Sequence, residues 1–179
     1  MKLEEKFLSR EEIYDGFVLH LVKDTVLLPD GNEAKREICL HKGASAVIPL
    51  TDEGEVIMVK QFRYAHGRVF LEIPAGKLDS ADEDPLCAAK RELKEETGAV
   101  AKHITSLGII DTTPALINER IHLYLAEGLV FGDSEPDEDE FVEVVKIPLS
   151  DLVQMVERGE ICDAKTQIAI LRAARIKGV

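Results

Sequence analysis

The sequence has few positive charges for its length. Its 179 residues include 22 lysines and arginines against 34 aspartates and glutamates, a formal net charge of −12. Proteins that hold nucleic acid on a basic surface usually show a cationic stripe. The acidic balance therefore argues against nucleic-acid binding. A ligand that carries phosphate would need cations to mediate its binding.

Cysteines and long apolar runs are also scarce. Cys39, Cys87 and Cys162 are an odd number, lie far apart and include no CxxC pair. This spacing predicts neither a disulfide framework nor a thiolate zinc site, and it fits free thiols in a reducing compartment. The opening MKLEEKFLSREE lacks the apolar core of a signal peptide, and no apolar run is long enough to span a bilayer. We therefore expect a cytoplasmic protein without a membrane partner.

The remaining composition, 45% hydrophobic, is that of a globular chain with a substantial core. Two partly alternating runs within residues 17–43 flank the turn formers at 29–32, which predicts an antiparallel hairpin. The strand that begins at residue 69 is expected to end at Pro74, which has no amide donor. Further strands are expected over residues 44–50, 55–62, 104–111, 120–130 and 141–149.

Three helices are predicted from their end signals. Asp84 fits the N-cap of the first, Pro85 its first position, and Gly98 the residue just past its end. Two more helices are expected over residues 150–158 and 163–176, capped by Ser150 and Asp163. Strands on either side of a central helix, with helices at the end, predict the α/β class: an α/β/α sandwich around a mixed sheet.

The octapeptide RELKEETG, residues 91–98, gathers an unusual charge at the end of the first helix. At about 100° per residue, Glu92, Glu95 and Glu96 lie within one arc of roughly 100°. Their mutual repulsion costs stability, and Glu95 and Glu96 also lie at the helix end whose dipole disfavours anions. Taken alone, the pattern fits surface ion pairs with nearby cations. It also fits a divalent cation among the glutamates, and hard oxygen ligands suit Mg²⁺ or Mn²⁺ better than zinc.

The segment GKLDSADEDPLCAAKRELKEETGA resembles the Nudix box of hydrolases that act on nucleoside diphosphates linked to another group. Seven positions match the family spacing: Glu83, Arg91, Glu92, Leu93, Glu95, Glu96 and Gly98. Two positions depart from the pattern. Six residues rather than five separate Gly76 from Glu83, and Ala99 stands where the family has a bulky aliphatic residue. An extra loop residue leaves the register of the helix intact.

The resemblance implies a set of metal ligands. It implies that Glu92 and Glu96 are the principal metal ligands and that Glu95 is an additional ligand. The main-chain carbonyl of Ala75 is the last ligand of the set. It implies Mg²⁺ as cofactor, with Mn²⁺ as a substitute, and a catalytic role for Arg91 in orienting a box glutamate. Metal ions so placed would polarise a pyrophosphate and lower the pKa of a bound water.

Most of the chain is similar to the ADP-ribose pyrophosphatase branch of the family. Four segments carry the likeness: AKREICLHKGASAV, VKQFRYA, LEIPAGKL and DAKTQIAI. Pro114, sixteen residues after Gly98, is placed as in ADP-ribose enzymes, although Ala115 stands where that branch has glycine. The resemblance implies that Arg63 binds phosphate, that Arg36 reaches the substrate from the hairpin, and that Glu119 holds a ribose hydroxyl or the base. Gly76 completes the expected substrate-binding residues.

The acidic stretch DSEPDEDEFVEV is either a solvated loop or the loop that brings a catalytic base over the metals. The resemblance to the branch implies that Glu138 is the base and that Glu140 supports catalysis and metal binding, with Glu140 as the alternative base. A carboxylate can act as base there if metals lower the pKa of the water.

The resemblance also predicts the organisation of the chain. Residues 1–42 are expected to form a hairpin subdomain exchanged within a homodimer, and residues 43–179 the Nudix hydrolase domain. The expected activity is Mg²⁺-dependent hydrolysis of ADP-ribose or a related nucleoside-diphosphate sugar. Two alternatives remain: a Nudix hydrolase of nucleoside triphosphates, dinucleoside polyphosphates or coenzyme A, and a nucleotide sensor that does not cleave its ligand.

Overall fold

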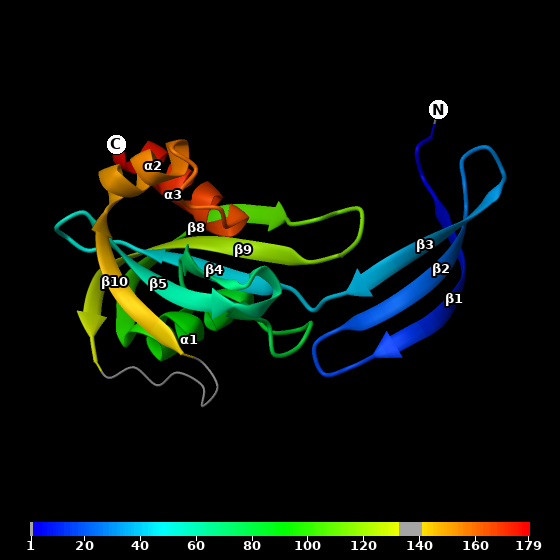
Figure 1. Cartoon of the computed structure of the whole chain (residues 1–179), viewed down its shortest axis with the longest axis horizontal. Coiled ribbons are helices and arrows are strands. Elements are labelled where there is room, and N and C mark those ends of the chain that lie inside the picture. The colour runs from blue at the N-terminus through cyan, green and yellow to red at the C-terminus, as the bar shows by residue number, and fades with distance from the viewer. Residues whose placement is uncertain (1, 133–140) are drawn as a thin grey trace. The chain divides into compact units, whose positions relative to one another are not determined.

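The computed structural model, shown in Figure 1, describes residues 2–132 and 141–179. The chain divides into two compact units. The first comprises the N-terminal residues up to Gly43 together with residues 111–120, and the second comprises residues 44–110 with the remainder from residue 121 onward. No helix among the described residues is long and apolar enough to cross a membrane.

The first unit is built on a three-stranded antiparallel sheet, in the order β1-β2-β3. Its strands are β1 (Lys6–Asp15), β2 (His20–Leu27) and β3 (Glu33–Leu40). The predicted hairpin is present as β2 and β3. The chain reverses at Gly31, whose φ of 88° suits glycine and whose amide donates to the Leu28 carbonyl at 3.0 Å.

Strand β1 was not predicted from the sequence. All ten of its residues are exposed in this chain, so they do not need the alternation of apolar and polar residues that marks a half-buried strand. Residues 111–120 lie beside the other edge of the sheet. The Cys39 amide donates to the Leu116 carbonyl at 2.8 Å, and the His41 amide donates to the Asn118 side chain at 2.7 Å.

The second unit holds a mixed sheet, as predicted. Its strands, in the order β7-β4-β9-β8, are β7 (Ala75–Lys77), β4 (Ala44–Pro49), β9 (Arg120–Phe131) and β8 (Ala99–Asp111). Strand β4 runs parallel to β9 and antiparallel to β7. A second antiparallel sheet, in the order β10-β5-β6, consists of β10 (Val142–Pro148), β5 (Glu55–Arg63) and β6 (Arg68–Glu72). A 3₁₀ turn, η1 (Tyr64–His66), joins β5 to β6.

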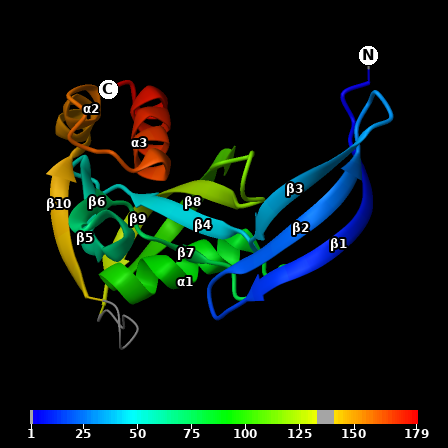
Figure 2. The same cartoon turned by 45° about the vertical axis from the view of Figure 1, so that its right-hand side comes forward.

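Helices cover both faces of the mixed sheet. They are α1 (Pro85–Thr97), α2 (Leu149–Glu157) and α3 (Ala164–Lys177). Figures 1 and 2 show α1 on one side of β4 and β9, and α2 and α3 on the other. Along β4, Val47 packs in the cluster that contains Leu93 of α1, whereas Ile48 packs in the cluster that contains Ile170 of α3. This alternation confirms the sandwich architecture.

Helix α2 begins one residue before the predicted cap. Pro148 occupies the N-cap position, and no side chain caps the helix. Ser150 therefore lies inside the first turn, where its hydroxyl lies 3.5 Å from the Asp151 carboxylate, and the predicted Ser150 cap is wrong. Asp163 does cap α3, since its side chain accepts from the Thr166 amide at 3.0 Å.

Candidate active site

Helix α1 is fixed at both ends by residues that the sequence marks. Asp84 accepts a hydrogen bond from the Leu86 amide at 3.0 Å, and Pro85 fills the first helical position. Gly98 ends the helix with a φ of 68°, a left-handed conformation that glycine adopts without strain. The Ser45 hydroxyl of β4 donates to the Pro85 carbonyl at 2.6 Å. These contacts set the position of every side chain on α1 relative to the sheet.

The glutamates of α1 lie on the side that packs against the sheet. Glu92 and Glu96 are only 8% and 3% exposed, on either side of the fully buried Leu93, while Glu95 is half-buried. Carboxylates are seldom this buried unless they are paired or bind a metal. Their burial therefore separates this cluster from an ordinary charged helix surface.

Strand β7 approaches the Glu92 carboxylate very closely. Residues Ala75 and Gly76 pair with Ala46 and Ser45 of β4, which holds β7 beside the helix. An ideal Cβ placed on Gly76 would lie 1.9 Å from the Oε1 atom of Glu92, far inside van der Waals contact. Glycine is thus the residue that lets the strand and the carboxylate lie side by side.

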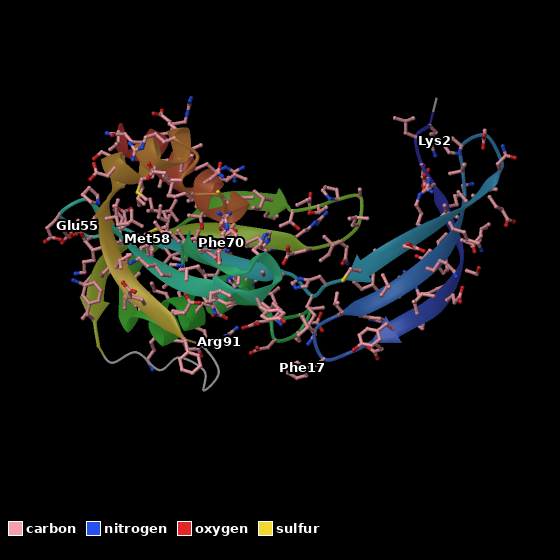
Figure 3. The ribbon with its side chains drawn as sticks, viewed as in Figure 1. Lys2, Phe17, Glu55, Met58, Phe70 and Arg91 are labelled. Carbon is pink, nitrogen blue, oxygen red and sulfur yellow. The ribbon has the colours of Figure 1, made fainter. Side chains whose placement is uncertain are left out.

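Arg91 binds two of the carboxylates at once, and Figure 3 labels it on α1. Its Nη1 atom donates to Glu92 at 2.7 Å and to Glu95 at 3.1 Å, and its Nη2 atom donates to the Lys77 carbonyl at 3.3 Å. Nη2 also lies 3.7 Å from Glu83. Burial lowers the pKa of Arg91, but Glu92 and the neighbouring carboxylates raise it by more. The guanidinium is therefore the organising cation of the cluster.

The donors gathered here fit a hard divalent cation. They are the carboxylates of Glu92, Glu95 and Glu96 and the main-chain carbonyl of Ala75, all oxygen ligands of the type that Mg²⁺ and Mn²⁺ prefer. The close approach at Gly76 brings the backbone of β7, which includes Ala75, next to the Glu92 carboxylate. Over residues 2–132 and 141–179, no three histidine, cysteine, aspartate or glutamate side chains are already arranged as a metal site. The fit therefore rests on the chemistry of the donors, which are carboxylate and carbonyl oxygens.

Arg63, at the end of β5, is held in a buried ion-pair network. Its Nε and Nη2 atoms each donate at 2.8 Å to one oxygen of Glu72, which is 2% exposed. Lys165 of α3 donates to the same carboxylate at 2.5 Å. Burial raises the pKa of Glu72, but the hydrogen bonds and charges of Arg63 and Lys165 outweigh it and lower that pKa to about 2. The hydrogen bonds to Glu72 raise the pKa of Arg63, and the negative charges of Glu72, Asp163 and Glu96 add to this.

Two further predicted site residues belong to the first unit. Arg36 on β3 makes a bidentate pair with Glu5, at 3.0 and 2.5 Å. Glu119 accepts a hydrogen bond from the Thr112 hydroxyl at 2.8 Å, and its other oxygen lies 3.6 Å from Nε2 of His41. The ring of His41 is fixed in turn, because its Nδ1 atom accepts from the Gly43 amide at 3.0 Å.

The second unit thus brings together Gly76, Arg91 and the three glutamates of α1, and it holds Arg63 in a separate network with Glu72 and Lys165. Glu138 and Glu140 lie outside the described residues. Glu72, Lys165 and His41 were not singled out from the sequence. A signal existed for Glu72, because it is a lone carboxylate between the apolar residues of VFLEIP.

Comparisons with known proteins agree with this geometry. The model of the NUDIX domain family matches residues 40–166. An ADP-ribose pyrophosphatase of Bacillus subtilis (strain 168) is 48% identical over 170 residues, covering 94% of this chain and 91% of that protein. A methanol dehydrogenase activator of Bacillus methanolicus is 43% identical over 169 residues, covering 93% and 91%. The crystal structure of an ADP compounds hydrolase has the same fold, with a TM-score of 0.86 at 22% identity over 99% of this chain and 97% of that chain. The chain therefore belongs to the NUDIX domain family.

Proposed function

We propose that the protein hydrolyses the pyrophosphate bond of ADP-ribose or a related nucleoside-diphosphate sugar. Water adds to one phosphorus, the bond from that phosphorus to the bridging oxygen breaks, and a nucleoside monophosphate and a sugar phosphate leave. The observation that carries the proposal is the burial of Glu92 and Glu96 on α1, together with the close approach of Gly76 to Glu92. Their context in a chain 48% identical to an ADP-ribose pyrophosphatase favours this substrate class.

Nudix pyrophosphatases generally use a divalent metal. For this chain we propose Mg²⁺, with Mn²⁺ as a substitute, held by Glu92 and Glu96 with Glu95 and the Ala75 carbonyl as further ligands. A cation bound there supplies charge neutralisation for the pyrophosphate and lowers the pKa of a bound water. It also explains how a chain with a net charge of −12 accepts an anionic substrate.

The arginines of the chain perform two different tasks in this proposal. Arg91 keeps Glu92 and Glu95 in fixed positions through charge-assisted hydrogen bonds. Arg63 binds a phosphate of the substrate, for which the planar guanidinium is well shaped. Arg36 and Glu119 contact the nucleoside or sugar, and Arg36 must first exchange its bond to Glu5 for one to the ligand.

The general base is proposed from the sequence. We assign that role to Glu138 and a supporting role in catalysis and metal binding to Glu140, with Glu140 as the alternative base. A carboxylate has too low a pKa to deprotonate ordinary water, so it can act as base only on a water already activated by the cation.

We further propose that the protein acts as a homodimer. The sheet of the first unit exposes large apolar side chains, among them Phe7, Tyr14 and Phe17, of which Phe17 is fully exposed (Figure 3). Large apolar side chains left exposed in such number are candidates for burial in an interface. A second copy of the chain is the occupant that the family resemblance favours. Sedimentation of the purified protein would show a dimer, whereas a monomer at micromolar concentration would refute this part of the proposal.

One substrate panel tests the activity. The protein is incubated with ADP-ribose, GDP-mannose, ATP, diadenosine tetraphosphate or coenzyme A, with and without Mg²⁺, and the products are separated by chromatography. The proposal expects AMP and ribose phosphate from ADP-ribose only when Mg²⁺ is present. Faster cleavage of ATP, the dinucleotide or coenzyme A would favour another Nudix activity. One relative is named as an activator of another enzyme, so a regulatory role is the second candidate. A sensor would bind ADP-ribose and leave it whole.

A further inference from the structure

Glu72 and Lys165 have no part in the proposed chemistry, yet they form one of the most buried ionic groups of the second unit. Glu72 is 2% exposed, and the Lys165 side chain is 11% exposed. A buried carboxylate is retained only where cations compensate the loss of hydration, and a cluster of this kind is not by itself stabilising. Stability alone is therefore a weak explanation for burying this group, and a second role follows from its contacts.

The carboxylate of Glu72 holds Arg63 by a two-point contact. Nε and Nη2 of Arg63 both donate to it, which fixes the plane of the guanidinium. No hydrogen bond of Nη1 to a residue in the ranges 2–132 and 141–179 is found, and the Arg63 side chain as a whole is 42% exposed. Glu72 thus binds the Nε and Nη2 atoms of Arg63, and Nη1 is left to bind a ligand.

The exposed part of Arg63 faces a cavity of about 330 Å³. Arg63 and Lys165 line it together with the aromatic rings of Tyr64, His66 and Phe70, the last of which is labelled in Figure 3. Arg63 therefore presents its guanidinium in an open cavity that a second cation, Lys165, also lines. An arginine at that place can reach a phosphate of a bound pyrophosphate.

Lys165 secures the arrangement from α3. Its ammonium donates to Glu72 at 2.5 Å and lies 3.0 Å from Asp163, the residue that caps α3. A second contact joins the same elements, because the Ile73 amide donates to the Thr166 hydroxyl at 3.0 Å. The start of α3 is thereby fastened to the end of β6, which keeps Glu72 in place.

We infer that Glu72 and Lys165 are positioning residues that hold Arg63 ready for the pyrophosphate of the substrate. Glu72 orients the guanidinium, and Lys165 shares the negative charge of Glu72 so that this carboxylate does not fully neutralise Arg63. A side chain that is already ordered loses less conformational entropy when its ligand binds. The inference rests on the phosphate-binding role proposed for Arg63, and it assigns a task to the segments LEIPAGKL and DAKTQIAI.

The test compares Lys165→Met, Lys165→Arg and the control Lys177→Met. Lys177 is on the same helix and also forms an ion pair, with Glu127, but at the opposite end. Binding is measured by calorimetry in the presence of Mg²⁺ with an analogue of ADP-ribose whose bridging oxygen is replaced by a methylene group, so that the ligand is not hydrolysed. Steady-state hydrolysis in Mg²⁺ gives KM and kcat separately, and thermal unfolding checks that each variant is folded.

Lys165→Met is expected to raise both the Kd and the KM by roughly three- to tenfold, the range that the ordering of one side chain implies, with kcat changed less than about twofold. Lys165→Arg restores most of the affinity, and Lys177→Met leaves it unchanged. Glu72→Gln shows an equal or larger loss of affinity where it folds. If Glu72→Gln does not fold, the comparison of Lys165→Met with Lys165→Arg still tests the positioning role.

A double-mutant cycle with Arg63→Met separates positioning from a general structural role. If Lys165 acts through Arg63, adding Lys165→Met to Arg63→Met has no further effect on Kd. Two losses that multiply, or an unchanged Kd in Lys165→Met beside a raised Kd in Arg63→Met, would overturn the inference and leave the proposed function standing. An unchanged Kd in Arg63→Met would instead overturn the phosphate-binding role of Arg63, and the positioning role with it.

Discussion

Replacement of Gly76 by alanine is a sharp test of the carboxylate cluster. Gly76 is not among the glycines with positive φ, so alanine can adopt its backbone conformation without strain. The added methyl group would nevertheless lie 1.9 Å from Oε1 and 2.2 Å from Cδ of Glu92. Ordinary contacts begin near 3.4 Å, so the carboxylate must move by more than about 1 Å. The change therefore displaces one predicted metal ligand.

We expect this movement to lower the turnover rate far more than the free energy of unfolding. Glu92 can rotate away at the expense of its partly exposed pair with Arg91, a contact worth up to about 1 kcal/mol. Replacing glycine where the backbone tolerates it gains about 0.4–1 kcal/mol by restricting the unfolded chain, which offsets much of that loss. A displacement of about 1 Å in a catalytic group, by contrast, can reduce the rate by roughly 100-fold.

The assay measures kcat for ADP-ribose at saturating Mg²⁺, together with the midpoint of thermal unfolding. The matched control is Gly132→Ala, because Gly132 also lacks a positive φ and its added Cβ would meet its nearest neighbour at an ordinary 3.8 Å. We expect normal unfolding in both variants, about 100-fold slower turnover in Gly76→Ala, and unchanged turnover in the control. A normal kcat in Gly76→Ala would refute the argument that Glu92 must lie beside β7.

Three further changes test other parts of the site. Glu96→Gln should fold normally and lose at least about 100-fold in kcat, and a normal rate at saturating Mg²⁺ would contradict its role as ligand. Glu138→Gln and Glu140→Gln should differ in kcat, the base showing the larger loss; if neither slows hydrolysis, the loop is only solvated. Because the pKa of Glu72 falls from 4.5 to about 2, its ionised form contributes on the order of 3 kcal/mol, fully present above about pH 4.5 and lost as the pH falls toward 2. Urea unfolding between pH 7 and 2.5 should show this loss in the parent chain and not in Glu72→Gln.

Much of the fold could be predicted because its signals are local. Asp84, Pro85 and Gly98 mark the ends of α1 through chemistry confined to a few residues, and the structure places those ends where expected. The fully exposed strand β1 has no buried face to impose a pattern, so the same reasoning missed it. Helix α2 begins at Leu149, one residue before the predicted start at Ser150. Pro148 occupies the N-cap position, so Ser150 lies inside the first turn.

In the site, too, contacts between residues close in sequence could be predicted, and contacts between distant residues could not. Helical spacing alone places Glu92 and Glu96 on one face, and both are buried together. The network of Arg63, Glu72 and Lys165 includes a hydrogen bond between residues 93 positions apart, and its members are recognisable as a group only after the chain has folded. A sequence pattern cannot show that the partner of Arg63 is a buried carboxylate rather than water.

The attachment of residues 111–120 to the first unit has a consequence for the order in which the protein is made. The edge of β3 is completed by the contact of Cys39 with Leu116, and 77 positions separate His41 from its partner Asn118. A ribosome therefore releases this strand edge long before it makes the segment that covers it, and an open edge readily pairs with another chain. The first sheet is consequently the region where nascent chains are most exposed to mispairing, and a fragment that ends at Gly43 would keep that exposure permanently.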